Sequence, residues 1–490
     1  PRWSAGPTSC TWTPTGSARR PGWTPPTPTP VRGGAENGAP RHITALACQE
    51  QLARQNARGD GPYDVESSVL NPYLKIEQWQ VINTTTWQAS DTLTVKNIIS
   101  YGEFREQTHF DLYSSNSRGP AGGSTLPTLS PFLPFTAAAG TPFKYIELDL
   151  VNPGGFNSIQ STMTEELQLQ GNVGDKLNYV IGGYLEFSRP LGNSSGRTGI
   201  YMNCTSPQDL ACTNPLFFGQ ISESRTQLSF NNHGIFGQAT YKFTDQLSVT
   251  GGLRYTFDNI FGYTTSTRMS FDPANRTGAS FIDPISGLRI ARQCTDSFRL
   301  GNGYIADGDI NRCRTDLTNK SNKATWTLGV DYKPMEDVLV YGKWSRGYRQ
   351  GGINFTNPGL EMWGPEGLDT FEIGTKTSFR GAVSGYLNVT GFYNKLRGMQ
   401  IFGGLTASAQ CPGVAGGAAI VNAGRARSYG LEVDASAAVL DNLLRFDLGY
   451  AYLNTKITEV ASQAALNALT VGTPFDANFG GSLRLTAAAN

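Results

Sequence analysis

The sequence has few charged residues and no long apolar run. Asp, Glu, Lys and Arg make up 16% of its 490 residues, whereas roughly 25% is usual for soluble domains. No stretch of about 18 consecutive apolar residues occurs, so the chain offers no candidate transmembrane helix. The low charge does not suit an ordinary soluble surface, and the lack of apolar runs excludes a helical membrane protein.

Signals for chemistry and for nucleic-acid binding are also missing. The net charge is +1 and no basic run stands out, so we expect no nucleic-acid partner. The three histidines, His42, His109 and His233, are not at metal-ligand spacing, and we expect no metal site and no cofactor. The sequence has no Ser/His/Asp spacing, GxSxG motif or phosphate-binding loop. We therefore do not expect an enzyme, and we assign no catalytic residues.

From about Glu77 onward, apolar and polar residues alternate regularly. In 247–257 the odd-numbered residues are Leu, Val, Gly, Leu, Tyr and Phe, and the even-numbered residues are Ser, Thr, Gly, Arg and Thr. A period of two with one polar face predicts half-buried strands. These strands run for about ten residues or more, which suits the ~9–11 residues of a membrane strand better than the ~5–6 of a soluble one. Aromatic residues near strand ends, such as Trp79 and Tyr332, are typical of a membrane interface.

Short polar turns alternate with longer segments along the chain. Gly, Asn and Asp suit tight hairpins, which we predict at residues 89–91, 174–176, 244–246, 334–337, 380–382 and 440–442. Segments rich in Gly, Pro, Ser, Asn and Thr predict loops at residues 114–158, 190–232, 264–322, 351–364, 403–418 and 459–473. This asymmetry predicts an all-β fold, an antiparallel transmembrane β-barrel with short periplasmic turns and long extracellular loops. The alternative is a soluble, secreted β-rich binding protein.

The N-terminal part differs from the rest. It is rich in Pro, Thr, Gly and Arg, shows neither helical nor strand periodicity and contains no apolar core of a signal peptide. We expect residues 1–70 to be disordered or irregular and residues 71–490 to form an incomplete barrel. For residues 1–40, a genuine tail and an artefact of cloning or gene calling both stay open.

Four phrases in the second half resemble TonB-dependent outer-membrane receptors, in the order and spacing of that family. They are YGKWSRGYRQGGIN at 341–354, PE at 365–366 with TFEIGTK at 370–376, LNVTGFY at 387–393, and VNAGRARSYGLE at 421–432 followed by LGYAY at 448–452. Two earlier phrases, FGQATY at 236–241 and GGLRY at 251–255, fit the same family. The resemblance covers roughly residues 77–485.

This resemblance implies a location and a function. It implies a bacterial outer-membrane barrel of 22 strands, closed by a plug domain and driven by the inner-membrane TonB complex. Its partners would be outer-membrane lipid and lipopolysaccharide, the TonB complex through a more N-terminal part, and a small-molecule cargo. The implied activity is energy-coupled uptake of a scarce, bulky nutrient, with a ferric siderophore as the expected cargo.

The sequence departs from the family pattern at both ends. We find no plug-like segment, no TonB-contacting segment and no first barrel strands, and residues 479–485 read as the start of one more strand. About thirteen strands are predicted in place of the family's 22. We therefore expect a partial barrel that does not work alone. A passive porin-like channel and a non-functional receptor fragment are the alternatives.

Four side chains are candidate substrate-binding residues. Arg254 lies on the polar face of a predicted strand, and Arg346, Tyr348 and Arg349 lie where another strand leaves the membrane. Arginine binds a carboxylate or a phosphate with two parallel hydrogen bonds, which suits an anionic cargo. The alternative for Arg254 is pairing with a plug or with water. The alternative for the other three is an aromatic girdle whose arginines reach lipopolysaccharide phosphates.

Four of the seven cysteines fall as two pairs in two long predicted loops. If these loops face outward, they lie in an oxidising compartment, where disulfides persist. We therefore predict one disulfide between Cys204 and Cys212 and another between Cys294 and Cys313. The alternative is that all are free thiols. Cys411 is left over, and its candidate partners are a cysteine in a missing part of the protein, Cys10 and Cys48.

Overall fold

A computed structural model gives the architecture of the chain, which is almost entirely β. The structure describes residues 52–61, 64, 72–110, 124–126, 135–137, 146–149, 155–200, 203–206, 211–213, 220–270, 280–282, 289–294, 309–408, 417–440 and 443–485. Within these ranges, no helix has the length and apolar character that crossing a membrane requires. The predicted all-β, antiparallel fold class is confirmed.

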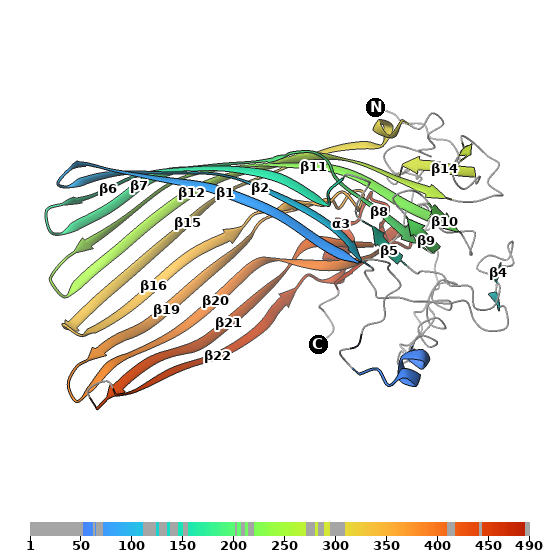
Figure 1. Cartoon of the computed structure of the whole chain (residues 1–490). Helices are drawn as coiled ribbons and strands as arrows, with labels where there is room; N and C mark the ends of the chain where they lie inside the picture. The colour runs from blue at the N-terminus through green and yellow to red at the C-terminus, as the bar shows by residue number, and fades with distance from the viewer. Residues whose placement is uncertain are drawn as a thin grey trace, which may run out of the picture.

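In the described ranges, twelve strands of 12 to 24 residues form one curved antiparallel sheet, in which each pairs with the next along the chain (Figure 1). They are β1 (Tyr73–Ser90), β2 (Leu93–Phe110), β6 (Ser158–Val173), β7 (Leu177–Pro190), β11 (Gln220–Lys242), β12 (Leu247–Ser270), β15 (Arg314–Met335), β16 (Val338–Arg349), β19 (Glu366–Phe379), β20 (Val383–Thr406), β21 (Gly417–Val439) and β22 (Leu444–Val460). Pairing of neighbours in chain order is the connectivity of an up-and-down barrel wall.

The short turns gather at one end of this wall, on the left in Figure 1. Six hairpins turn there, at the six positions predicted from the sequence. They are β1–β2, β6–β7, β11–β12, β15–β16, β19–β20 and β21–β22. Two turn glycines have positive φ, Gly174 at 55° and Gly381 at 138°, which a glycine adopts without strain. The opposite end of the wall carries the longer connections.

Several strands run further than the sequence predicted. The β11–β12 ladder is continuous from Lys242, opposite Ser248, to Gln220, opposite Ser270. It therefore enters both predicted loops 190–232 and 264–322, and β15 takes up the end of the second, so those loop bounds are wrong. The reason is that the outer parts of these strands are mostly polar on both faces, which removes the alternation signal. Cross-strand contacts such as Thr226 Oγ1 to Thr264 Oγ1, 2.9 Å apart, hold them together.

The two faces of the wall differ in chemistry. In β12, Leu253 and Phe257 are 60% and 44% exposed, whereas Thr256 and Asp258 are 7% and 6% exposed. The pairing register carries this alternation from strand to strand, and exposed Ile373 in β19 and Leu448 in β22 lie on the same face as Leu253. We call this apolar face the outward face and the polar one the inward face. In a membrane barrel, the apolar face meets lipid.

The wall has two edges within the described residues. There β1 pairs only with β2 and β22 only with β21, and every residue of both strands is exposed. The wall therefore does not close on itself, as expected for a partial barrel. The sequence predicted about thirteen strands. The described ranges hold twelve long strands, and the strand predicted to begin at 479–485 does not join the wall after β22.

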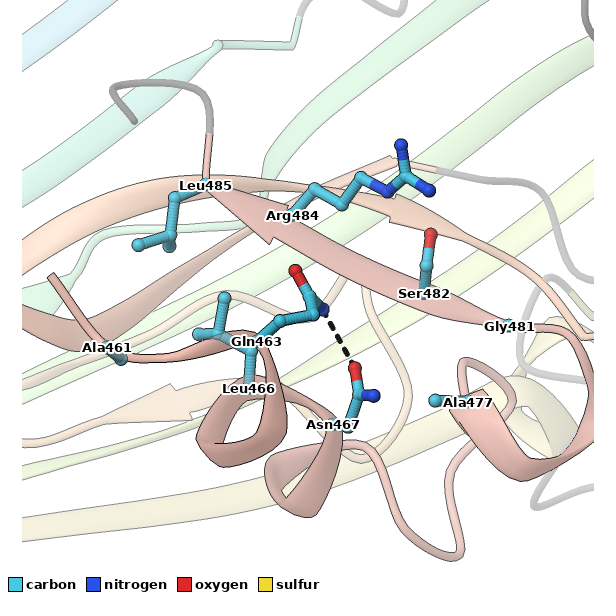
Figure 2. A pocket seen from close by; sticks show the side chains of 9 residues that line it. All are labelled: Ala461, Gln463, Leu466, Asn467, Ala477, Gly481, Ser482, Arg484 and Leu485. Carbon is cyan, nitrogen blue, oxygen red and sulfur yellow. Dashed lines mark hydrogen bonds between the residues drawn. The ribbon is translucent and has the colours of Figure 1, made fainter. Parts of the chain in front are cut away.

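The C-terminal segment folds back as a small cap at the loop end of β20 and β21. It consists of helix α3 (Gln463–Leu469), the short 3-10 helix η2 (Ala477–Phe479) and strand β23 (Ser482–Leu485). The sequence predicted that residues 479–485 start one more strand of the wall. Instead, β23 pairs with β20 and does not continue the wall after β22. Phe475 and Leu483 are fully buried and pack with residues of β20, β21 and α3. A hollow of about 590 Å³ lies against α3, η2 and β23, and Figure 2 shows the side chains that line it.

The segment predicted to be irregular, residues 1–70, is described only in part. Residues 52–58 form a helix, which the sequence pattern did not predict. The rest of the prediction for this segment lies largely outside the described residues.

Candidate functional site

Arg254 lies on the inward face of β12, among side chains of β7 and β11. Its guanidinium stands over the rings of Tyr184 and Phe236, at 5.1 and 5.8 Å from their centroids. Its Nε donates a hydrogen bond of 3.1 Å to Thr256 Oγ1. A Cβ at Gly234 would lie 2.7 Å from Arg254 Nη2. The missing side chain at Gly234 is therefore what leaves room for the guanidinium.

Carboxylates and amides surround this arginine. Glu186 accepts hydrogen bonds from the Tyr184 hydroxyl (2.9 Å) and from Asn232 Nδ2 (3.1 Å). Asp258, which is 6% exposed, accepts a hydrogen bond from the Tyr348 hydroxyl. Aromatic rings, an arginine and carboxylates on one face form a surface with both hydrogen-bond donors and acceptors. Such a surface is suited to holding a polar, aromatic or anionic small molecule.

The structure divides the four candidate residues. Arg254 and Tyr348 meet on the inward side at Thr256 and Asp258. The β15–β16 ladder ends at the pair Trp326–Arg346, so Tyr348 lies beyond it and its ring reaches β12. Arg349 binds Glu366 of β19, with Nη2 at 2.8 Å from Oε1.

Arg346 lies on the other face. It stands opposite Trp326 and Asp369 in register and therefore shares the outward face with Leu253. Its guanidinium makes two hydrogen bonds of 2.6 Å to the Asp369 carboxylate and lies 4.2 Å from the Trp326 ring centroid. Arg346 therefore does not join Arg254 in the inward group.

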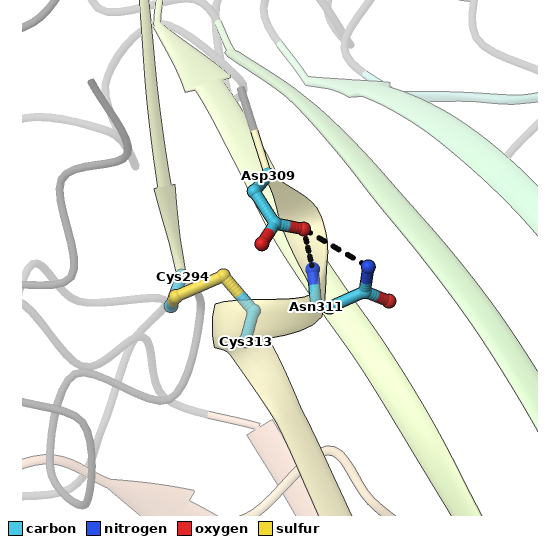
Figure 3. The surroundings of a disulfide bond; sticks show 4 residues. All are labelled: Cys294, Asp309, Asn311 and Cys313. Atoms are coloured by element: carbon cyan, nitrogen blue, oxygen red, sulfur yellow. Dashed lines mark hydrogen bonds between the residues drawn. A yellow bond between two sulfur atoms is a disulfide. The ribbon is translucent and has the colours of Figure 1, made fainter. Parts of the chain in front are cut away.

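A disulfide links Cys294 to Cys313 at the loop end of β12 and β15 (Figure 3). Cys294 ends strand β14 (Arg289–Cys294), which pairs with β12, and Cys313 ends the short helix η1 (Ile310–Cys313). Asp309 caps that helix by accepting a 3.0 Å hydrogen bond from the Asn311 backbone N–H. Both cysteines are 2% exposed. The bond therefore fastens β14 to the start of β15.

The other predicted pair can be placed only at the level of the backbone. Cys204 in β9 (Asn203–Ser206) lies directly opposite Cys212 in β10 (Ala211–Thr213). This register suits a bond across the hairpin, and the disulfide between them stays a prediction. Cys10, Cys48 and Cys411 lie outside the described residues.

The sequence alone does not single out most of the residues that lie around Arg254. Four of these residues lie on the polar face of strands in which apolar and polar residues alternate: Tyr184, Glu186, Asn232 and Asp258. A polar residue is the rule at such positions, so no single one stands out. The useful signal was Gly234, since a glycine inside a long strand often marks a close approach of another group. In the described part of the chain, no group of three or more His, Cys, Asp or Glu is placed to hold a metal ion.

One family model matches nearly the whole chain. It is described as "TonB dependent receptor-like, beta-barrel", and the match spans residues 12–487. A comparison with curated proteins gives no match.

The comparison with solved structures finds receptors and transporters. The ferric yersiniabactin uptake receptor FyuA from Yersinia pestis has 12% identity and a TM-score of 0.48, over 81% of this chain and 45% of that one. The siderophore receptor PiuA from Acinetobacter baumannii has 14% identity and a TM-score of 0.45, over 80% and 48%. The copper transporter OprC has 12% identity and a TM-score of 0.43, over 80% and 48%. The chain thus spans about half the length of these chains.

Proposed function

Because the chain belongs to the TonB-dependent receptor family, whose barrels lie in the outer membrane of Gram-negative bacteria, we propose that it forms part of the wall of a receptor for energy-coupled nutrient uptake. The proposed cargo is a ferric siderophore. The observation that carries the proposal is the inward group around Arg254, which presents charge, aromatic rings and hydrogen-bond donors on the polar face of a membrane wall.

The chemistry of this group fits the proposed cargo. A ferric siderophore is a bulky molecule that presents oxygen atoms and often carries negative charge around a metal that is already enclosed. A guanidinium and a phenol hydroxyl bind such oxygens without needing to bind the metal. Arg254, Tyr348 and Arg349 are proposed as cargo contacts. Arg346, which is held by Asp369 on the outward face, is not.

Energy coupling is the second part of the proposal. In this family the energy comes from the TonB complex, and we propose that the whole protein engages this complex through a part other than the described wall. A passive channel would transport cargo without energy input. The dependence of transport on the proton gradient therefore separates the two functions.

Uptake by whole cells tests both parts. The assay measures the uptake of iron-55, supplied as a ferric siderophore complex, by cells that express the gene encoding this chain. It is run with and without a protonophore. We expect uptake that the protonophore abolishes and that Arg254→Gln lowers. Arg445→Gln, which removes an inward arginine paired with Asp447 at 3.0 Å, serves as the matched control and is expected to leave uptake unchanged. Uptake that resists the protonophore would support a passive channel and would refute the proposal.

A further inference from the structure

A polar patch interrupts the outward face of β1, β2 and β6, which lie side by side in the wall (Figure 1). The patch consists of Asn83 and Thr85 in β1, Asn97 in β2 and Glu165 in β6. Asn83 and Glu165 both stand opposite Ile99, and Thr85 stands opposite Asn97. Directly opposite residues share a face of a sheet. These four polar side chains therefore gather on one small area of the outward face.

The pairing register places Glu165 on the outward face. Glu165 stands opposite Leu185, and the row continues through His233 to Phe257, an outward residue of β12. The next residue along the chain, Glu166, faces inward, because successive side chains of a strand alternate between its two faces. Of this acidic pair, only Glu166 therefore lies on the polar face of the wall.

Aromatic side chains bound the patch at both ends along β1. Trp87 lies on the side of the short turns, and Trp79 lies on the side of the loops, where its ring centroid is 5.5 Å from that of Tyr101. At and beyond the level of Trp79, the outward face carries an ion pair of Arg105 with Glu103, at 2.6 Å. The nine residues from Trp79 to Trp87 match the ~9–11 residues that a membrane strand needs. The patch therefore lies within the apolar band that meets lipid.

Glu165 is exceptional within this band. On the described strands β2, β6 and β7, every other outward residue between the register row of Tyr101 and the short turns is uncharged. Glu165 is half-buried and accepts a hydrogen bond of 3.2 Å from Asn97 Nδ2, and no cation of the described ranges pairs with it. A carboxylate can accept about four hydrogen bonds, and lipid chains donate none. An ionisable side chain at this position therefore indicates a polar partner within the membrane.

The patch is complementary to itself. It holds a strong acceptor, the Glu165 carboxylate, beside two amide donors, the Nδ2 groups of Asn97 and Asn83. Each Nδ2 group carries two hydrogens, and Asn97 uses one of them for Glu165 of its own chain. Asn83 Oδ1 accepts a hydrogen bond of 2.9 Å from Thr85 Oγ1. When two copies meet about a two-fold axis, the same patch of each faces the other, so each carboxylate meets the amides of the other copy.

We propose that the patch is the contact surface of a symmetric dimer of this chain within the outer membrane. Glu165 of each copy accepts hydrogen bonds from Asn97 and Asn83 of the other, and such bonds stabilise association where lipid offers no alternative. Val81 and Leu167, which are 63% and 48% exposed on the same face, pack around the polar contact. The proposal rests on the outer-membrane location of the family and is independent of the cargo, which contacts the inward face.

Resonance energy transfer between donor- and acceptor-labelled copies of the full chain, diluted with lipid in vesicles, measures the dimer dissociation constant. Glu165→Leu should raise this constant roughly tenfold, which corresponds to about 1.4 kcal/mol for the two contacts related by the two-fold axis. Glu166→Leu, the same substitution at the neighbouring inward residue, is the matched control and should leave the constant unchanged. Urea unfolding at high lipid dilution should show that Glu165→Leu is at least as stable as the wild type, because leucine suits a lipid-facing position.

Photocrosslinking in cells identifies the partner and does not depend on how the Glu165 variant folds. A photoreactive amino acid at position 167, beside the patch, should give a covalent dimer of two differently tagged copies. The same amino acid in place of Leu253 of β12, or of Tyr450 on the open edge strand β22, should give none; both positions are exposed on the outward face.

Four results would overturn the proposal. They are an equal dissociation constant for Glu165→Leu and the wild type, equal yields of dimer from positions 167 and 450, an adduct of position 167 with another protein alone, and no adduct at position 167. Equal yields from positions 167 and 450 would show that the copies associate through the open edges of the wall. None of these outcomes bears on iron uptake.

Discussion

The disulfide between Cys294 and Cys313 should stabilise the loop end of the wall locally. The two cysteines are 19 residues apart in sequence, so the bond closes a loop of about 20 residues. Restricting the open chain by such a loop lowers its entropy by about 11 cal/mol/K, which amounts to about 3 kcal/mol at 25 °C. Replacing both cysteines by serine should therefore lower the free energy of local opening by about this amount.

The affected backbone can be named from the pairing. β14 is held to β12 by the register pairs Thr267–Cys294 to Ser270–Ala291, and this short ladder detaches first when the bond is absent. Hydrogen exchange of the detergent-solubilised protein measures it. The amides of 267–270 and 291–294 that bond across this ladder should exchange about 100-fold faster in the double serine variant.

Two controls make the result interpretable. Amides of β12 near the short turns, opposite Lys323 to Tyr332 of β15, should exchange at an unchanged rate. Reduction of the wild type, which is slow because both sulfurs are buried, should give the same change as the serine variant. Unchanged exchange in 267–270, or an equal increase along all of β12, would refute the reasoning.

Three further predictions concern packing and hydrogen bonding. Gly262→Ala should destabilise the outer β11–β12 ladder by about 1–3 kcal/mol, because the added Cβ would clash with the Gln227 carbonyl oxygen. The control Gly251→Ala adds a Cβ that meets nothing within 4 Å, so urea unfolding should show a loss of stability for the first variant only. Phe475→Ala should cost the cap about 3–5 kcal/mol and speed proteolysis within residues 461–485, whereas Leu443→Ala, at a position 78% exposed, should leave proteolysis unchanged. Tyr348→Phe should cost about 1–3 kcal/mol, because it leaves the buried Asp258 carboxylate without its donor; hydrogen exchange at the end of β16 that stays at the wild-type rate would contradict this.

The membrane-crossing part of the fold was predictable because the bilayer imposes a strict pattern. Every second residue of a membrane strand faces lipid and must be apolar. Strands such as 247–257 and 383–393 are therefore recognisable from this alternation alone. Outside the bilayer this constraint disappears. The outer halves of β11, β12 and β15 are mostly polar on both faces, so no alternation indicates that residues 220–232 continue the wall.

The candidate site was predictable only in part. Alternation alone separates Arg346 from Arg349, since they are an odd number of positions apart in one strand and face opposite sides. It assigns Tyr348 to the side of Arg346, but the structure brings its hydroxyl to Asp258 because the β15–β16 ladder ends before it. The C-terminal cap was also missed, because its core joins Phe475 and Leu483 to β20 and β21 by contacts that local sequence does not encode.

If the wall has one face in lipid and one in water, successive residues of β20 must alternate between the two surroundings. A nitroxide carried on a non-native amino acid is placed in turn at each position from 386 to 393, in protein reconstituted into bilayers. Labels at odd positions, which include Leu387 and Val389, should be accessible to dissolved oxygen. Labels at even positions, which include Asn388 and Thr390, should be accessible to a water-soluble nickel chelate. Accessibility to the chelate at odd and even positions alike would contradict the account.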